Sequence, residues 1–397
     1  MQAETTVQFK KQLGQFFTVN SNYVLQGLEK FVVNKNISDP FAGSGDLLSW
    51  ARNNGAKTVA GFEIDKNLVD NRIIFYGDSL KEKRKYDFIV TNPPYLNINK
   101  ADKETKEKYF KSSGFEDLYQ ISLNSILNSK EGIVVIPINF LSAENSRKIR
   151  NLFFEKFRIV KINYFKQQVF PDTTSNVITF YYRSIRKSDN PENQEVETNF
   201  FPEKNSTKIF LEKKFHWTIG GRIINPINIV DNHLKIRRLV ESDIQSGQYK
   251  IQAAYNHIKN KKEVKVSSSL KKIINSNIMF LKAIDSGSEN GKIALEDIRK
   301  HGVKCLISKP TSRHMIYLIS DSNKLSINIQ EKIIDLFNKE INQLRNDQFS
   351  LFLTNYRDKD RKRISFDFTY KFINYLYFTK ILGQLPIESR KTGVLFS

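Results

Sequence analysis

The stretch Ile37-Ser38-Asp39-Pro40-Phe41-Ala42-Gly43-Ser44-Gly45 decides the fold, because a short apolar run leads into a glycine-rich turn and then into a helical pattern. Residues 37–40 predict a strand, and residues 46–54 predict a helix with one apolar face. Glycines at such a turn let a ligand approach the backbone and let the helix pack closely on the strand. A dinucleotide fingerprint would need another glycine where Leu48 stands, so the turn disfavours a nicotinamide cofactor.

The same alternation of strands and helices runs through the first half of the chain. Residues 132–138 form a continuous apolar run, as expected of a strand that is buried on both faces. This alternation predicts an α/β fold, a Rossmann-like and mostly parallel sheet with helices on both faces. Further strands are expected at residues 58–62, 73–76, 86–91, 159–165 and 177–183, and further helices at residues 118–127 and 142–155.

The length of 397 residues indicates two domains, and the composition changes near the middle of the chain. Residues 1–185 are expected to form the α/β domain. Residues 186–225 are rich in Asn, Glu, Lys, Pro and Ser and are expected to be a connecting segment. Residues 226–397 are Lys-rich and lack a βαβ rhythm, so we expect a second domain of the α+β class there.

The charge balance favours a polyanionic partner. The chain has 63 Lys and Arg residues against 42 Asp and Glu residues, a formal net charge of +21. This excess suits nucleic acid or an anionic membrane surface, and the alternative is a Lys-rich surface that serves only solubility. Because 40% of the residues are hydrophobic, the chain can form real cores and general disorder is excluded.

The single cysteine, Cys305, excludes an intrachain disulfide framework and a cysteine-based zinc site, and no metal site is expected. Residues 1–11 are polar, so we expect no signal peptide. The longest apolar runs are far shorter than the roughly 20 residues that span a bilayer. We therefore expect a cytoplasmic protein without a membrane partner.

Acidic residues follow three successive strands. Asp39, at the end of the first strand, suits a ligand that carries a positive charge. Glu63 lies about 20 residues past the glycine turn, where a carboxylate can accept hydrogen bonds from both hydroxyls of a ribose. Asp78 follows the third strand and can accept a hydrogen bond from an adenine amino group. Each is an ordinary loop carboxylate when taken singly, and their order is what indicates a nucleoside site.

The loop Asn92-Pro93-Pro94-Tyr95 directly follows the strand expected at residues 86–91. Two consecutive prolines fix φ and remove two backbone donors. The Pro93 carbonyl and the Asn92 side-chain oxygen are then acceptors at the edge where ligands of open α/β sheets bind. Two acceptors directed at one point suit a planar amino group, and Tyr95 offers a flat face for stacking.

With these motifs in this order, residues from about 10 to 185 resemble the gamma-class N6-adenine DNA methyltransferases, the Taq I type of restriction–modification systems. The resemblance begins at Leu13-Gly14-Gln15-Phe16-Phe17-Thr18 and extends to Val169-Phe170-Pro171. It implies S-adenosyl-L-methionine as the cofactor. By the resemblance, the cofactor-binding residues are Phe16, Thr18, Asp39, Pro40, Ala42, Gly43, Glu63, Ile64, Asp78, Ser79 and Asn92, and the catalytic residues are Asn92, Pro93, Pro94, Tyr95 and Phe170.

The resemblance also implies the reaction. The enzyme would transfer a methyl group to the N6 amino group of an adenine that has been flipped out of duplex DNA. Tyr95 and Phe170 would stack on the base, while Asn92 and the Pro93 carbonyl would accept hydrogen bonds from its amino group. No covalent intermediate is required, and Cys305 lies outside the motifs.

The second half would then be the target-recognition domain, since it mixes cationic side chains with amide and aromatic ones. As DNA contacts we expect Arg313, Arg357, Arg361 and Arg363, with a solvated face or pairing with Asp358 and Asp360 as the alternative. The expected partners are double-stranded DNA and a separate cognate restriction endonuclease, and the chain is expected to act as a monomer in a bacterial or archaeal cytoplasm.

Other substrates and another class of protein remain open at this point. Asn-Pro-Pro-Tyr loops also occur in methyltransferases that act on RNA bases or on protein glutamine. Cytosine-N4 methylation is a further alternative, although the Asn at the first loop position favours adenine in the family. Pro171-Asp172 with Glu212-x-Lys214 has the letters of a nuclease site, although such triplets are frequent in a Lys-rich chain. A DNA-binding module without activity is disfavoured by the intact loop.

Overall fold

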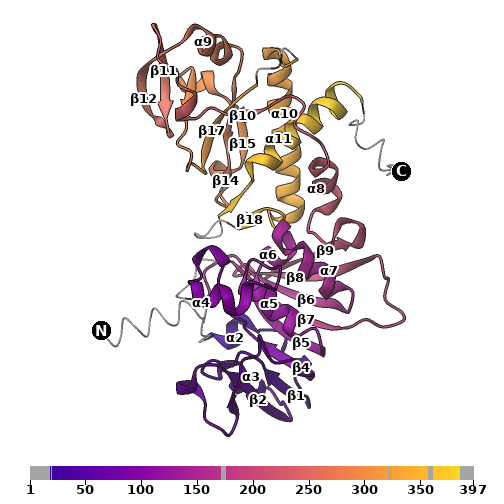
Figure 1. Ribbon diagram of the computed structural model, residues 1–397. Helices are drawn as coiled ribbons and strands as arrows, with labels where there is room; N and C mark the ends of the chain where they lie inside the picture. Colours follow the sequence, from indigo (N-terminus) through magenta and orange to yellow (C-terminus); the bar gives the residue numbers. More distant parts are fainter. Residues whose placement is uncertain are drawn as a thin grey trace. The chain divides into compact units, whose positions relative to one another are not determined.

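The computed structural model describes residues 18, 20–170, 176–320, 322, 324–355 and 361–384. They fall into two compact units (Figure 1). The first comprises the described residues up to Gly221 together with Asn355, and the second comprises those from Arg222 to Thr354 and from Arg361 onward. No helix in these ranges is long and apolar enough to cross a membrane.

The first unit is built on a nine-stranded mixed sheet with the order β3-β2-β1-β4-β5-β7-β6-β8-β9. The strands from β3 to β5 are parallel, β7 runs antiparallel to both of its neighbours, and the outermost pair, β8 and β9, is antiparallel. Ladder pairing confirms the expected α/β fold. The strands are β1 (Asn36–Asp39), β2 (Thr58–Glu63), β3 (Ile74–Tyr76), β4 (Tyr86–Thr91), β5 (Ser129–Pro137), β6 (Phe157–Phe165), β7 (Val177–Ser184), β8 (Asn193–Phe201) and β9 (Asn205–Glu212).

Helices cover both faces of this sheet. On one face, Leu47, Leu48 and Trp50 of α3 pack with β-strand residues such as Phe88 in one core cluster. On the other, Phe153 of α7 contacts Phe180 and Tyr182 of β7 edge to face. The helix expected at residues 142–155 is interrupted by a 3₁₀ turn, Glu144–Ser146. The helices are α2 (Ser21–Val24), α3 (Asp46–Asn53), α4 (Lys103–Thr105), α5 (Leu118–Ser125), α6 (Asn139–Ser142) and α7 (Arg147–Phe154).

Residues 186–225, expected to be a connecting segment, instead contribute β8 and β9 to the sheet. Val196, Phe200, Ile209 and Leu211 are buried, whereas the charged residues Glu195, Glu197 and Lys208 beside them face solvent. This alternation is typical of an antiparallel hairpin at the edge of a sheet, with one face exposed to solvent. The composition of the segment does not indicate strands, because many of its residues are polar or charged.

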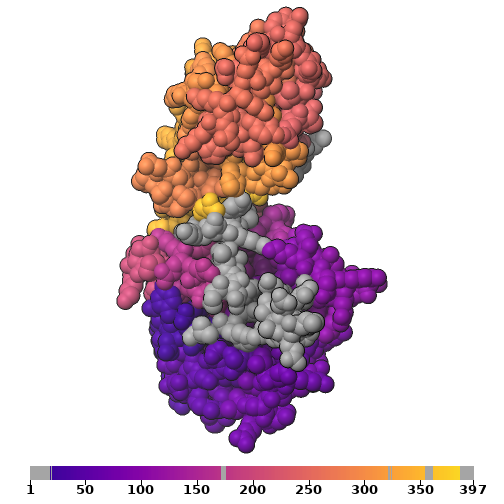
Figure 2. Space-filling view, turned by 90° about the vertical axis from the view of Figure 1, so that its left-hand side faces the viewer, coloured from indigo at the N-terminus to yellow at the C-terminus, as the bar shows by residue number. Residues whose placement is uncertain are grey.

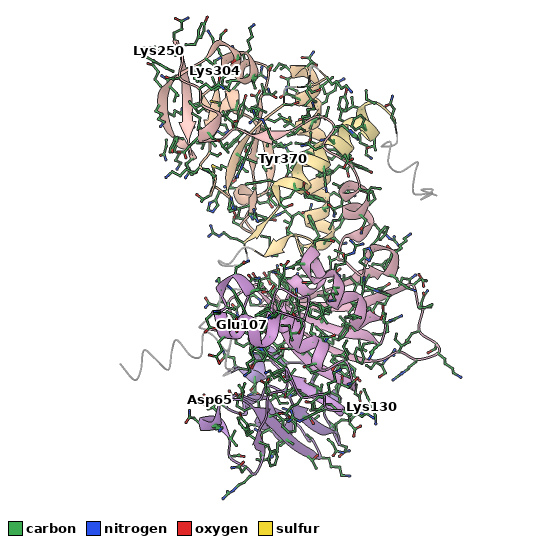
Figure 3. The ribbon with its side chains drawn as sticks, viewed as in Figure 1. Asp65, Glu107, Lys130, Lys250, Lys304 and Tyr370 are labelled. Atoms are coloured by element: carbon green, nitrogen blue, oxygen red, sulfur yellow. The ribbon has the colours of Figure 1, made fainter. Side chains whose placement is uncertain are left out.

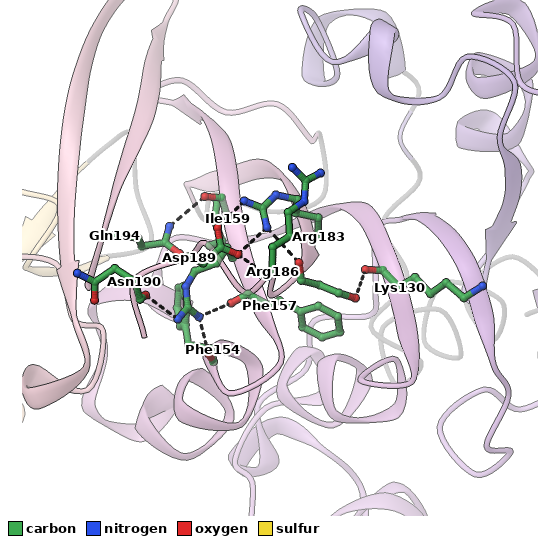
Figure 4. A network of polar contacts seen from close by, with 11 residues as sticks. Lys130, Phe154, Phe157, Ile159, Arg183, Arg186, Asp189, Asn190 and Gln194 are labelled. Atoms are coloured by element: carbon green, nitrogen blue, oxygen red, sulfur yellow. Dashed lines mark hydrogen bonds and ion pairs between the residues drawn. The ribbon is translucent and has the colours of Figure 1, made fainter. Parts of the chain in front are cut away.

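A polar network fixes the connection between β7 and β8 (Figure 4). Arg183 donates to both carboxylate oxygens of Asp189, at 2.7 and 2.8 Å, and this pairing holds the pKa of Asp189 well below its usual range. Arg158 donates to the Phe154 and Asn190 carbonyls, which ties the turn to β6. Bidentate pairs of this kind are geometrically specific.

The second unit has its own core and is of the α+β class, as expected. An antiparallel sheet, β10-β17-β13-β15, packs against α10, where the Asn338 amide forms two hydrogen bonds with the Leu295 backbone. A second sheet, β12-β11-β16, carries the Lys-rich strand β12, which is exposed along most of its length. Figure 2 shows this salmon-coloured region at the surface. The elements after the first sheet are α8 (Gly221–Asn228), β10 (Arg237–Arg238), β11 (Tyr249–Tyr255), β12 (His257–Val266), α9 (Ser268–Asn275), β13 (Met279–Lys282), β14 (Ile284–Asp285), β15 (Ala294–Asp297), β16 (Cys305–Ile307), β17 (Met315–Ile319), α10 (Ile327–Gln348), β18 (Thr354–Asn355), β19 (Lys362–Arg363) and α11 (Phe366–Tyr375).

Close packing around the glycine-rich turn depends on Gly61 in β2. A Cβ atom there would lie 2.6 Å from the Ala42 Cβ and 2.8 Å from the Leu48 Cδ1. Neither neighbour can yield easily, because Ala42 belongs to the turn and Leu48 to the buried face of α3. The turn therefore rests directly on the β2 backbone.

We expect Gly61→Ala to lower the free energy of unfolding by about 1–3 kcal/mol, as overpacking of a tight core does. Urea denaturation of the full chain measures this change. Ser49→Ala, on the exposed face of α3, is the matched control and should change stability little. Equal stability of the two variants would contradict the packing described.

Candidate active site

The candidate site lies where the strand order of the first sheet reverses, between β1 and β4. The chain passes from β1 outward to β2 and β3, and then returns to β4 on the other side of β1. Parallel strands place their carboxyl ends at one edge, and a crevice opens at such a switch point. Asp39 ends β1 and Thr91 ends β4, so the glycine-rich turn and the residue 92–95 loop leave the sheet side by side.

Asp39 is buried at this crevice, with 1% of its surface exposed. Its Oδ1 accepts hydrogen bonds from the Thr91 hydroxyl at 2.6 Å and from the Phe41 N–H at 3.0 Å. Its Oδ2 has no hydrogen-bond partner among the described residues. Burial raises the pKa of Asp39 from 3.8 to about 7, and the neighbouring Glu63 adds to this effect. A carboxylate in this state favours a cationic ligand group.

Glu63 ends β2 and faces the glycine-rich turn. Its Oε2 accepts the Gly43 N–H at 2.8 Å, and its Oε1 accepts the Asp65 N–H at the same distance. Burial raises the pKa of Glu63. Gly43 has a φ of 53°, a left-handed conformation that glycine adopts without strain. The bond to Glu63 therefore fixes both the turn and the carboxylate.

Asn92 joins the amino-terminal segment to the loop. Its amide donates to the Thr18 hydroxyl at 3.0 Å, and its Oδ1 accepts the Tyr95 hydroxyl at 2.6 Å. The Tyr95 hydroxyl also lies 2.6 Å from the Val135 carbonyl oxygen. Among the described residues, no backbone N–H donates to the Pro93 carbonyl. Asn92 lines both hollows, whereas Pro93 lines neither of them.

Asp78 follows β3 and is held by three donors. Its Oδ1 accepts the Leu80 N–H at 3.2 Å, and its Oδ2 accepts the Tyr109 hydroxyl at 2.9 Å. The Lys108 ammonium lies 3.3 Å from the same Oδ2. Tyr109 and Lys108 come from a π-helical turn, Lys106–Phe110, which the sequence analysis did not single out.

Two adjoining hollows bring these residues together. The larger has about 610 Å³ of empty space, part of which is open to solvent. The smaller, of about 230 Å³, lies around Asp39, and Asn92 lines both. The larger is lined by Pro40, Phe41, Gly43, Phe62, Glu63, Ile64, Gly77, Asp78, Ser79, Leu80, Asn92, Pro94, Tyr109 and Leu118; the smaller by Thr18, Asp39, Phe41, Ala42, Gly43, Ser44, Asp46, Leu47 and Asn92.

The hollows fit S-adenosylmethionine, the cofactor that the resemblance implies. The unpartnered Asp39 Oδ2 suits the cationic methionine end. The larger hollow carries Glu63 and Asp78, two carboxylates that suit ribose hydroxyls and an adenine amino group. Asn92 lies where the two parts of such a ligand would meet.

Two of the predicted site residues need separate comment. Phe170 was expected to stack on a base, but it is 1% exposed and belongs to the core cluster against which Tyr95 packs. It therefore belongs to the core on which Tyr95 of the loop packs. Phe16 lies outside the described residues.

Several lining residues were missed by the sequence analysis. Phe41 and Phe62 are adjacent in sequence to predicted residues, so their position beside those residues could have indicated them. Tyr109 lies 31 positions from Asp78 in the chain, and no spacing rule connects the two.

The predicted DNA contacts belong to the second unit, except Arg357, which lies outside the described residues. Ala283 links two of their segments, because its N–H donates to the His314 carbonyl at 2.8 Å and its carbonyl accepts the Ile364 N–H at 3.1 Å. Arg313 directly precedes His314, and Arg363 directly precedes Ile364. The structure therefore brings together segments that lie 50 residues apart in sequence, from His314 to Ile364.

Positive charge concentrates around His314. Burial lowers the pKa of His314, and Arg361, Arg363 and His257 lower it further. Arg238 donates to the carbonyls at positions 310 and 312 and thereby fixes the loop that carries Arg313. We call Arg313, Arg361 and Arg363, which lie on the segments around His314, the cationic cluster.

Comparison with known proteins supports the resemblance to methyltransferases for the first half of the chain. Residues 6–170 match the sequence model of the Eco57I restriction-modification methylase family. The type II methyltransferase M.AccI of Acinetobacter calcoaceticus is 23% identical over 205 residues, which are 44% of this chain and 37% of that protein. The chain thus matches little more than a third of the length of this curated relative. The resemblance to restriction–modification methyltransferases that use S-adenosylmethionine is confirmed.

Solved structures with a related fold are more distant. The type IIL restriction–modification enzyme MmeI, in complex with DNA, gives a TM-score of 0.49 at 13% identity, over 93% of this chain and 65% of that one. The methyltransferase subunit of a type I restriction–modification system from Streptococcus thermophilus gives a TM-score of 0.33 at 16% identity, over 49% and 50%.

We expect Asp39→Asn to stabilise the ligand-free protein by roughly 1–2 kcal/mol near pH 8, the size of a single favourable substitution. The amide oxygen still accepts from Thr91 and Phe41, but the buried charge is gone. Because the pKa of Asp39 is raised from 3.8 to about 7, the cost of its ionisation grows between these values and is complete above pH 7. The gain should therefore be smaller near pH 5. Denaturant titrations at both pH values measure it.

The control is Asp46→Asn, since the Asp46 carboxylate lines the same hollow but accepts the Ser44 hydroxyl at 2.6 Å. It should give no gain that grows with pH. A pH-independent effect of Asp39→Asn would show that the Asp39 carboxylate is not an uncompensated buried charge.

Proposed function

We propose that this chain is a DNA methyltransferase that transfers a methyl group from S-adenosylmethionine to the N6 amino group of an adenine in duplex DNA. The observation that carries the proposal is the position of Asn92, which lines both hollows and begins a loop with two oxygen acceptors. Modification within a restriction–modification system is the function we infer from the matched family.

The cofactor, when bound, supplies an electrophilic methyl group. Asp39 would hold its cationic end, Glu63 its ribose and Asp78 its adenine. Pro40, Ala42, Ile64 and Ser79 would form walls of the same hollows.

The loop would recognise the target amino group by exchange of one hydrogen bond. The Asn92 Oδ1 accepts the Tyr95 hydroxyl in the ligand-free chain. Because the Val135 carbonyl is a second acceptor at the same distance, the Tyr95 hydroxyl keeps a partner when a base amino group takes its place. The base amino group would then donate to Asn92 and Pro93, and these preorganised acceptors stabilise positive charge as it develops on the nitrogen.

A paired adenine cannot reach this edge, so the base has to leave the helical stack at a cost of a few kcal/mol. The Tyr95 ring would recover part of that cost by stacking, which contributes about 1–3 kcal/mol per base. Phe170 would act indirectly, by supporting the loop from the core.

The second unit would bind the DNA through its cationic side chains. Phosphate contacts by Arg and Lys supply most of the sequence-independent affinity for DNA. The cationic cluster unites three of the four arginines that the sequence suggested. The net charge of +21 agrees with such a partner.

Transfer of a labelled methyl group to duplex DNA without added magnesium, followed by mass spectrometry of the nucleosides, tests the proposal. N6-methyladenine is the expected product. N4-methylcytosine would overturn the adenine assignment. Label found only in RNA or in protein glutamine would overturn the DNA assignment.

We expect Asn92→Ala to slow single-turnover methyl transfer about 10²–10³-fold at saturating cofactor, as removal of one preorganised polar group does in other enzymes. Rapid-quench measurements give this rate independently of cofactor affinity. Asn99→Ala removes an exposed amide outside both hollows and is the control. An unchanged rate in the Asn92 variant would exclude its proposed role.

We expect the double charge reversal Arg361→Glu and Arg363→Glu to weaken DNA binding and to flatten its salt dependence. Each lost phosphate contact lowers the slope of log K against log salt by about 0.9. The matched control reverses Lys130, which is labelled in Figure 3, and Lys208. Both are exposed lysines of the first unit, and their reversal changes the net charge equally. Equal salt slopes in both double variants would mean that the cationic cluster does not contact phosphates.

A further inference from the structure

Directly after the catalytic loop, the chain forms a long segment whose two ends are joined by backbone hydrogen bonds. The Ile98 N–H donates to the Glu116 carbonyl at 2.8 Å, and the Leu118 N–H donates to the Leu96 carbonyl at 2.9 Å. The Asn97 amide also donates to the Asp117 Oδ1 at 3.2 Å. We call residues 97–117, which these contacts close at the base, the strap; Glu107, labelled in Figure 3, lies on it.

The strap reaches the larger hollow through two neighbouring side chains. Tyr109 lines that hollow and donates its hydroxyl to the Asp78 Oδ2 at 2.9 Å. The Lys108 ammonium lies 3.3 Å from the same oxygen. Burial and the adjacent Asp78 raise the pKa of Tyr109, so its hydroxyl stays protonated and acts as the donor.

These contacts make the two oxygens of Asp78 unequal. Oδ2 accepts from Tyr109 and pairs with Lys108, whereas Oδ1 accepts only the Leu80 N–H, at 3.2 Å, among the hydrogen bonds that the described residues form. A carboxylate oxygen has two acceptor positions. Oδ1 therefore retains acceptor capacity on a side chain whose orientation the strap has fixed.

We propose that Tyr109 is a positioning residue that, with Lys108, orients Asp78 so that its Oδ1 accepts a hydrogen bond from the exocyclic amino group of the cofactor's adenine. This inference deepens the proposed function and rests on it. The exposed Lys108 contributes less, because a solvated ion pair is weak. The chemistry selects a 6-amino purine over a 6-oxo purine, whose oxygen would face the carboxylate.

The test compares the binding of two nucleosides, S-adenosylhomocysteine and S-inosylhomocysteine, by calorimetry on the full chain. They differ at the purine 6-position, which is an amino group in one and an oxo group in the other. The wild-type chain should prefer the amino compound by at least about a hundredfold, since a site built to bond an amino group rejects an analogue without it. Asp78→Asn should reduce or reverse this preference, because an amide can donate to the oxo group.

Tyr109→Phe keeps the ring but removes the hydroxyl. We expect this variant to bind S-adenosylhomocysteine about tenfold more weakly, as loss of a hydrogen bond to a charged group does, and to discriminate less between the two nucleosides. Tyr23→Phe is the control: the Tyr23 hydroxyl accepts from Gln167 at 2.9 Å and does not line either hollow. If Tyr109 had only a structural role, Tyr109→Phe would lower the affinity for both nucleosides by the same factor.

The outcomes separate this inference from the proposed function. Equal affinity of the wild-type chain for both nucleosides, or unchanged discrimination in Tyr109→Phe, would overturn the inference while leaving a cofactor site intact. Failure of the wild-type chain to bind either nucleoside would overturn the cofactor assignment and the inference together.

Discussion

The hydrogen bond between the Thr91 hydroxyl and the Asp39 carboxylate is the contact on which the site depends. It joins the ends of β1 and β4 across the point where the strand order reverses, and both side chains are buried. The glycine-rich turn leaves the sheet on one side of this bond and the loop at residues 92–95 leaves on the other. A buried carboxylate costs free energy when one of its oxygens has no hydrogen-bond partner, as holds for Asp39 Oδ2 within the part of the chain that the structure describes. The fold bears that cost at the place where a cationic ligand would relieve it.

The two units therefore gather side chains of opposite charge. The hollows of the first unit collect carboxylates, although the whole chain carries a net charge of +21. The second unit gathers cationic side chains around His314. A cationic cofactor and a polyanionic substrate would each meet the charge that favours it. Net charge alone could not reveal this division, because it sums over both units.

Residues that line the hollows could be proposed from the sequence where a strand ends. Asp39 and Glu63 are the last residues of β1 and β2, and Asn92 directly follows β4, so all three lie at local features that the sequence pattern indicates. Tyr109 was not found, because its contact with Asp78 depends on how the strap folds back. The β8–β9 hairpin was missed because charged residues alternate with its few apolar ones. Burial of Phe170 depends on packing around it, which a motif does not contain.

The reversed strand β7 has a consequence for how such a protein can change during evolution. A parallel neighbour would need a crossover of a dozen or more residues, whereas an antiparallel one needs only a hairpin connection. Because β7 runs against β6, the connection from Phe165 to Val177 begins and ends at the same sheet edge as the loop at residues 92–95. A change in the length of that connection would therefore act at the edge where the hollows lie and would leave the order of the strands as it is.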